Sequence, residues 1–176
     1  MMCKKVLSGL FWVCMRKRRA EQKIKKKTLK EKQSLKKLIL FLLSDVFKDI
    51  CINSWFLHVL IYFIDSAYFK LNGKLLSGSN YVKSCNVPVC LDVVDVIRHL
   101  ISEGVVVESR FDWSLALYKI NPVCGVRVRY SPFVSSFVRE VAVRLHGTDY
   151  VDIVNLCIID DILRIHDNNE LIVFNK

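Results

Sequence analysis

The longest apolar stretch of the chain runs from Trp55 to Ile64 and is hydrophobic on nearly every side. A helix that is apolar all round is normally buried at the centre of a protein. Asn53 and Ser54 are good N-terminal caps, and Gly73 is a good left-handed stop. The pattern therefore predicts a central core helix of about five turns between these residues.

Two more helical patterns flank this stretch. Residues 38–47 form an apolar run, which together with residues 50–64 resembles a membrane span in hydropathy. Polar residues interrupt the combined run too often for a span, so two buried helices of one domain are expected. After the central helix, residues 91–102 form an amphipathic pattern that buries its aliphatic residues and exposes three charged ones, Asp92, Asp95 and Arg98.

Strands are predicted where β-branched residues dominate without a helical period. Such segments are residues 105–110, 115–120 and 126–130, and a last one lies at 171–174. The order of a helix followed by a hairpin is that of a winged helix, and equally that of many small α+β domains.

Two helices are predicted near the C-terminus. The first begins with Pro132 in its first turn and ends at Gly147. The second is capped by Thr148 or Asp149, with the Asp160–Asp161 pair on its exposed side. Its buried side is expected to hold six aliphatic residues, Val151, Ile153, Val154, Ile158, Ile159 and Ile162. The predicted fold is a helix-dominated single α+β domain with a small antiparallel sheet.

Charge divides the chain unevenly. Residues 1–37 hold 14 Lys and Arg against 2 Glu, a net charge of +12, whereas residues 38–176 are net −2. We therefore expect a basic N-terminal extension over residues 1–37 and one domain over residues 38–176. Seven residues of the extension are candidate contacts to an anionic partner: Arg16, Lys17, Arg18, Arg19, Lys25, Lys26 and Lys27. The alternative is a solvated helix that binds nothing.

The first fifteen residues resemble a short signal peptide, but Arg16–Arg19 follow at once and offer no small-residue cleavage site. The apolar run is also too short to span a bilayer. Two interpretations stay open: an interfacial anchor, or a true translation start at Met15.

The segment between the central helix and the next one, residues 74–86, is rich in turn residues and is expected to be a loop. Around it lies a set of residues that resembles the Panacea domain, also called the SocA-like antitoxin domain. The matching residues are Tyr62–Phe63, Asp65, Gly73, Leu76, Tyr81 and Pro88–Val89, with Val93 and Leu100 on the next helix. Where the family usually has Gly-Pro-Val, this chain has Val87 before Pro88.

The resemblance covers residues 50–110 and implies a protein-binding module that neutralises a toxin or presents it to a protease. The residues that it implies for partner binding or for organising the loop are Tyr62, Asp65, Gly73, Tyr81, Pro88 and Val89. The partner is then a protein, with no small-molecule substrate. The alternatives are a nucleic-acid-associated regulator that uses the basic arm, and a membrane-surface protein, of which the second is not favoured.

Asp65 is the one acid inside a strongly apolar run. It could be a catalytic carboxylate with a raised pKa, but the favoured role is to accept hydrogen bonds from the backbone of the following loop. Tyr81 is expected on the exposed surface of that loop, as an anchor for the partner.

Enzymatic chemistry is not indicated. The chain contains no Gly-rich phosphate loop, no Gly-x-Ser-x-Gly and no His-Glu-x-x-His. Its seven cysteines form no Cys-x-x-Cys and are typical of a reducing compartment, which predicts a cytoplasmic location. Cys85 and Cys90 have no matching His or second Cys pair, so neither a metal site nor a cofactor is expected.

Overall fold

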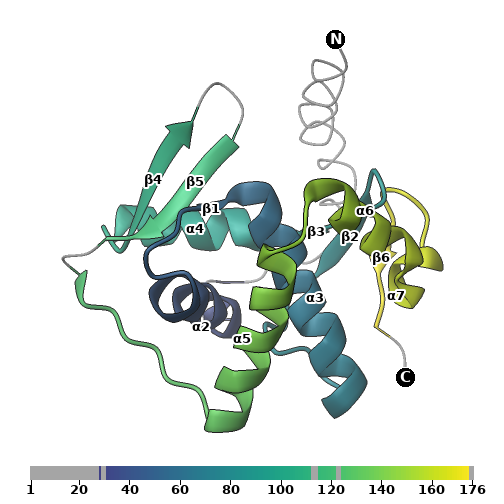
Figure 1. Ribbon diagram of the computed structural model, residues 1–176, viewed down its shortest axis with the longest axis horizontal. Helices are drawn as coiled ribbons and strands as arrows, with labels where there is room; N and C mark the ends of the chain where they lie inside the picture. Colours follow the sequence, from purple (N-terminus) through teal and green to yellow (C-terminus); the bar gives the residue numbers. More distant parts are fainter. Residues whose placement is uncertain (1–27, 29–30, 112–114, 122–123, 175–176) are drawn as a thin grey trace.

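Helix α3 (Ser54–Asn72) crosses the middle of the computed structural model, which describes residues 28, 31–111, 115–121 and 124–174 (Figure 1). Its capping is as predicted, since the Asn53 side chain accepts a hydrogen bond from the backbone N–H of Phe56 at 2.7 Å. Gly73 ends the helix with a φ of 66°, a left-handed angle that favours glycine. Most of the helix is buried, which confirms a central core helix.

A first antiparallel sheet lies beyond one end of α3. Its strands are β1 (Ile52–Asn53), β4 (Val106–Phe111) and β5 (Leu115–Ile120), in the order β1-β5-β4. The hairpin of β4 and β5 was predicted, and it follows helix α4 (Val93–Ser102) directly. The order of helix and hairpin is therefore present in the fold, with β1 added beside the hairpin.

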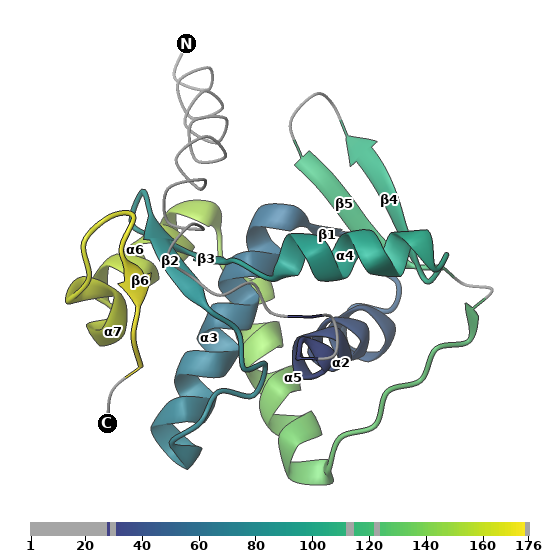
Figure 2. The ribbon, with the colours of Figure 1, turned by 180° about the vertical axis from the view of Figure 1, so that it is seen from behind.

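A second antiparallel sheet lies on the other side of α3, as both views show (Figures 1 and 2). It consists of β2 (Tyr81–Ser84), β3 (Val87–Cys90) and β6 (Leu171–Ile172), in the order β3-β2-β6. The prediction of a loop over residues 74–86 is wrong for its last part, because the chain turns back at Cys85 and Asn86. Both turn residues have positive φ, 50° and 64°.

The third predicted strand, residues 126–130, is not a strand. This segment is extended but pairs with no strand of either sheet within the described part of the chain. It connects the hairpin to helix α5 (Pro132–His146), whose start is capped by Ser131. The fold is thus the helix-dominated α+β domain that was predicted, but with two small sheets instead of one.

Helix α2 (Gln33–Phe41), continued by the π-helical turn η1 (Leu42–Val46), crosses the boundary expected between residues 37 and 38. Leu35 is fully buried in the core. Lys32 is only 4% exposed, and its Nζ lies 3.2 Å from Asp92 Oδ1 and 2.8 Å from Asp95 Oδ2. The prediction that Asp92 is exposed is wrong, since Asp92 is 8% exposed and forms an ion pair with the buried Lys32.

Two short helices, α6 (Tyr150–Ile159) and α7 (Asp161–Arg164), complete the fold beside the second sheet (Figure 2). Asp149 caps α6, as one of the two predicted alternatives. Asp160 ends α6 and caps α7, so the Asp160–Asp161 pair does not lie on one helix as expected. Among the described helices, none has both the length and the apolar content that crossing a membrane requires.

Candidate functional site

Asp65 lies on the buried side of α3 and has no exposed surface. Its carboxylate accepts hydrogen bonds from the Ser77 backbone N–H at 2.8 Å, from the Ser77 hydroxyl, and from the Tyr81 hydroxyl at 2.6 Å. We call these three residues the Asp65 cluster. As expected from the sequence, Asp65 therefore holds the segment after α3 against the helix.

Burial raises the pKa of the Asp65 carboxyl above its ordinary value, although the hydrogen bonds from Ser77 and Tyr81 oppose the shift. Burial also raises the pKa of Tyr81, with the neighbouring Asp65 charge acting in the same direction. A raised carboxyl pKa is typical of catalytic acids. Here, however, Asp65 and Tyr81 have no exposed surface and Ser77 is 2% exposed, so a substrate has no access to the carboxylate.

The prediction that Tyr81 lies on an exposed loop is wrong. Tyr81 opens strand β2, where it pairs with Cys90 on one side and with Ile172 on the other. Its ring packs edge-on against Tyr62, with centroids 5.5 Å apart. The Asp65 cluster is thus a structural element of the core and offers no side chain to a partner.

Tyr62 makes a second buried connection. Its hydroxyl donates a hydrogen bond to Asp160 Oδ1 at 2.6 Å, and the same oxygen accepts from the backbone N–H groups of Ile162 and Leu163. Burial and the Asp160 carboxylate hold the pKa of Tyr62 far above its ordinary value, so the hydroxyl remains a donor. This bond joins α3 to the junction of α6 and α7.

The remaining residues implied by the resemblance lie at the end of α3 or in strand β3. Gly73 ends α3, Pro88 is buried in β3 opposite Lys83, and the half-buried Val89 pairs with Val82. A proline is tolerated in β3 because this strand lies at the edge of its sheet. The structure therefore brings the six implied residues together around α3 and the β2–β3 hairpin. There they stabilise the fold. The seven basic residues proposed as anionic contacts, from Arg16 to Lys27, lie outside the described residues.

The exposed apolar surface of α6 was not expected from the sequence. Val151, Val154 and Ile158 follow one side of this helix at helical spacing. Val151 is 63% exposed, Ile158 48% and the neighbouring Ile159 68%, although all three were predicted to be buried. The helix packs against β3 and α7 mainly through Ile153 and Cys157, which leaves its other side uncovered by the described residues. We call Val151, Val154, Ile158 and Ile159 the α6 stripe.

The C-terminal segment that contains this stripe is acidic. Residues 147–174 hold six Asp and Glu but only one Lys or Arg, which is Arg164. Two of the acids lie at the start of α6, where Asp149 is the N-cap and Asp152 is in the first turn. The sequence does contain a signal for this surface. Helix α6 has apolar residues on nearly all its sides, whereas a helix with one core-facing side needs them on that side alone.

Within the described residues, no group of three His, Cys, Asp or Glu side chains is placed to hold a metal ion. Cys85 is exposed in the hairpin turn and Cys90 is buried in β3, and both are free thiols. Burial raises the pKa of the Cys90 thiol to about 12, so it stays protonated.

Comparison of the chain with protein-family models, with curated proteins and with solved structures found no match in any of the three.

Proposed function

We propose that this chain is a non-enzymatic protein-binding module that binds its partner through the α6 stripe. The observation that carries the proposal is the exposure of three aliphatic side chains on one short helix, Val151, Ile158 and Ile159. Exposed apolar surfaces of this kind, with polar residues around them, are typical of protein interaction sites.

The charge around the stripe indicates the kind of partner. Because carboxylates dominate residues 147–174, a complementary surface has an apolar centre and lysine or arginine at its rim. The resemblance to the Panacea domain adds a role to this surface: the partner is a toxin that the chain neutralises or presents to a protease. The five described cysteines are free, which supports a cytoplasmic location for this binding.

The experiment uses the protein encoded beside the gene of this chain, co-expressed with the tagged full chain. We expect wild type to retain this protein, and Val151→Ser combined with Ile158→Ser to weaken the retention at least about tenfold, since each aliphatic side chain contributes on the order of 1 kcal/mol when buried. Val107→Ser is the matched control, because Val107 is 47% exposed on β4, in the other sheet. Equal retention by the double variant and wild type contradicts the proposal.

A second candidate function is nucleic-acid association, which the order of α4, β4 and β5 and the +12 charge of residues 1–37 favour. The acids Asp92 and Asp95 on α4 oppose phosphate binding at that helix, although Lys32 pairs with both. Steeply salt-dependent retention on DNA, unchanged in the α6 double variant, is the outcome that selects this candidate over the first.

A further inference from the structure

The extended segment from Val126 to Tyr130 is held to the domain by side chains. Val126, Val128 and Tyr130 are half-buried, whereas Arg127 and Arg129 between them are exposed. The Tyr130 ring packs edge-on against Phe41, with centroids 5.3 Å apart. This alternation of inward and outward side chains is that of a β-strand.

The backbone of this segment is unpaired. Within the part of the chain that the structure describes, the N–H and C=O groups of residues 126–130 make no hydrogen bond. Pairing resumes on either side, where the Cys124 N–H donates to Asn121 O and Ser131 O accepts from the Ser135 N–H. Such a row of unpaired groups is a template on which another extended chain can add as a strand.

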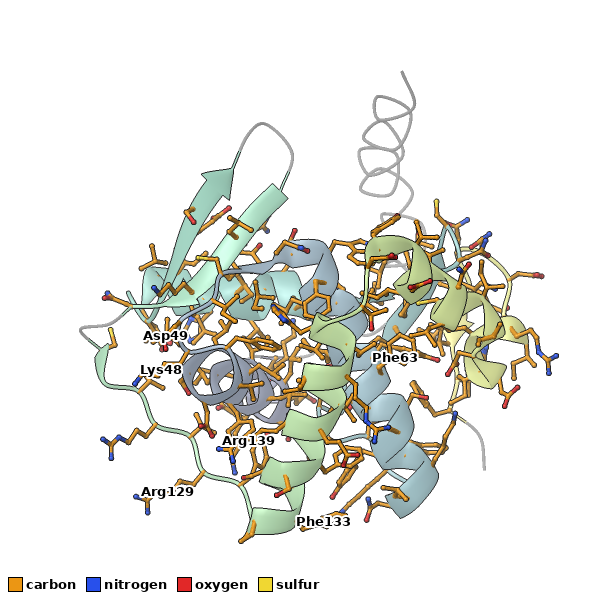
Figure 3. The ribbon with its side chains drawn as sticks, viewed as in Figure 1. Lys48, Asp49, Phe63, Arg129, Phe133 and Arg139 are labelled. Atoms are coloured by element: carbon orange, nitrogen blue, oxygen red, sulfur yellow. The ribbon has the colours of Figure 1, made fainter. Side chains whose placement is uncertain are left out.

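A groove of about 600 Å³ runs beside the segment. It is lined by Gly125 to Arg129, by Lys119 to Asn121 at the end of β5, and by Ser44, Asp45, Lys48 and Asp49 in and after η1. Figure 3 shows Lys48 and Asp49 near the base of the β4–β5 hairpin, and the Arg129 side chain pointing away from the core. The groove therefore provides space beside a segment whose backbone groups are unpaired.

The groove is positively charged. Four basic side chains line it, Lys48, Lys119, Arg127 and Arg129, against the acids Asp45 and Asp49. Asp45 is already paired, since the Arg139 guanidinium lies 2.6 Å from its Oδ2. An incoming segment therefore meets an excess of positive charge.

We propose that this groove binds an extended acidic segment of a partner protein, which adds as a β-strand to residues 126–130. Both features are needed for this assignment: the unpaired backbone selects a peptide over a nucleic acid, and the charge selects an acidic peptide. The groove is separate from the α6 stripe, so this interaction goes beyond the function proposed above.

The test measures binding of a fluorescent eight-residue peptide of alternating glutamate and valine to the full chain. We expect a version with lysine in place of glutamate, and one with N-methylated valines, to bind at least about tenfold more weakly. Arg127→Glu combined with Arg129→Glu should weaken binding of the acidic peptide at least about tenfold, whereas Arg98→Glu, at an exposed arginine on α4, should change it by less than about twofold. On binding, the amides of residues 126–130 should exchange more slowly with deuterium.

Three results overturn the proposal: no binding of the acidic peptide at millimolar concentration, equal binding of the N-methylated version, or equal binding of an oligothymidylate. Equal binding of the N-methylated peptide means that charge attraction alone, without strand pairing, binds the peptide. Equal binding of the oligothymidylate means that the groove binds polyanions in general. We expect the double variant Val151→Ser and Ile158→Ser to bind the acidic peptide as wild type does. A negative result for the groove can therefore be distinguished from a negative result for the α6 stripe.

Discussion

At the scale of single residues, the Asp65 cluster shows how one buried carboxylate fixes a turn-rich segment. Three donors from two residues, Ser77 and Tyr81, meet on Asp65, which has no exposed surface. Because a buried acceptor without its donors costs about 1–3 kcal/mol, each member depends on the others.

The raised pKa of Asp65 predicts a pH dependence of stability. The folded protein keeps the Asp65 proton to a higher pH than the unfolded chain, so protonation favours folding and this contribution is present below the unfolded pKa of about 3.9. It is lost as the pH rises through the folded pKa. We expect the unfolding free energy of wild type, relative to Asp65→Asn, to fall over that range in urea titrations between about pH 3 and pH 8.

The matched control for this titration is Asp161→Asn, which removes a carboxylate whose side chain is 80% exposed. If wild type instead gains stability over Asp65→Asn as the pH rises, the ionised carboxylate is the form that folding favours, and the expected sign is wrong.

Tyr81 provides a second prediction at this scale. Tyr81→Phe removes the hydroxyl, and with it the hydrogen bond to Asp65 and the 3.4 Å contact with the Ser77 hydroxyl, and should lower the unfolding free energy by about 1–2 kcal/mol. Tyr81→Ala also removes a fully buried ring and should cost about 3–5 kcal/mol. Thermal or urea melts measure both. An alanine variant that melts like wild type is incompatible with the burial of this side chain.

At the scale of elements, α2 belongs to the domain and not to a separable arm. Leu35 lies in the core, and Lys32 pairs with Asp92 and Asp95 of the α4 segment. A chain of residues 38–176 loses both, whereas a chain of residues 28–176 keeps them. We expect the shorter chain to be less stable by at least about 2–5 kcal/mol, the cost of one buried leucine.

Urea unfolding of the two truncated chains measures this difference directly. The variant Leu35→Ala in the longer chain separates the loss of the leucine from the loss of the helix. Equal stability of both truncated chains means that the domain begins after residue 37, as the charge distribution alone predicted.

The elements also show which signals in the sequence are reliable. Helix α3 was predictable because its cap, its stop and its apolar pattern agree on the same residues, Asn53 and Gly73. The β2–β3 hairpin was not, because its turn residues are Cys85 and Asn86 and not Asn-Gly or Asp-Gly. Residues 126–130 have the composition of a strand, but a strand forms only when a partner is beside it, and composition contains no information on the partner.

The candidate site was less predictable than the fold. Local sequence identified Asp65 as the acceptor for the following segment, but the burial of Tyr81 depends on β6, which is distant in the sequence. The α6 stripe was missed because apolar residues on a helix predict a buried surface and do not say which protein buries it.

At the scale of the whole molecule, the acidic C-terminal segment and the basic groove lie in different regions. The α6 stripe lies among the carboxylates of residues 147–174, and the groove beside residues 126–130 is positively charged. Figure 1 shows the two regions on different sides of α3. One partner with both a basic apolar surface and an acidic tail, or two different partners, could therefore be bound at the same time.

The position of β2 between β3 and β6 also has a consequence for synthesis on the ribosome. The chain emerges with its N-terminus first, so β2 and β3 can pair soon after Cys90 is made, long before Leu171 and Ile172 exist. Until then, the second edge of β2 and the Tyr62 hydroxyl both lack their partners from the C-terminal region. A nascent chain that stalls between these points exposes an open strand edge, which is the kind of surface that chaperones protect from aggregation.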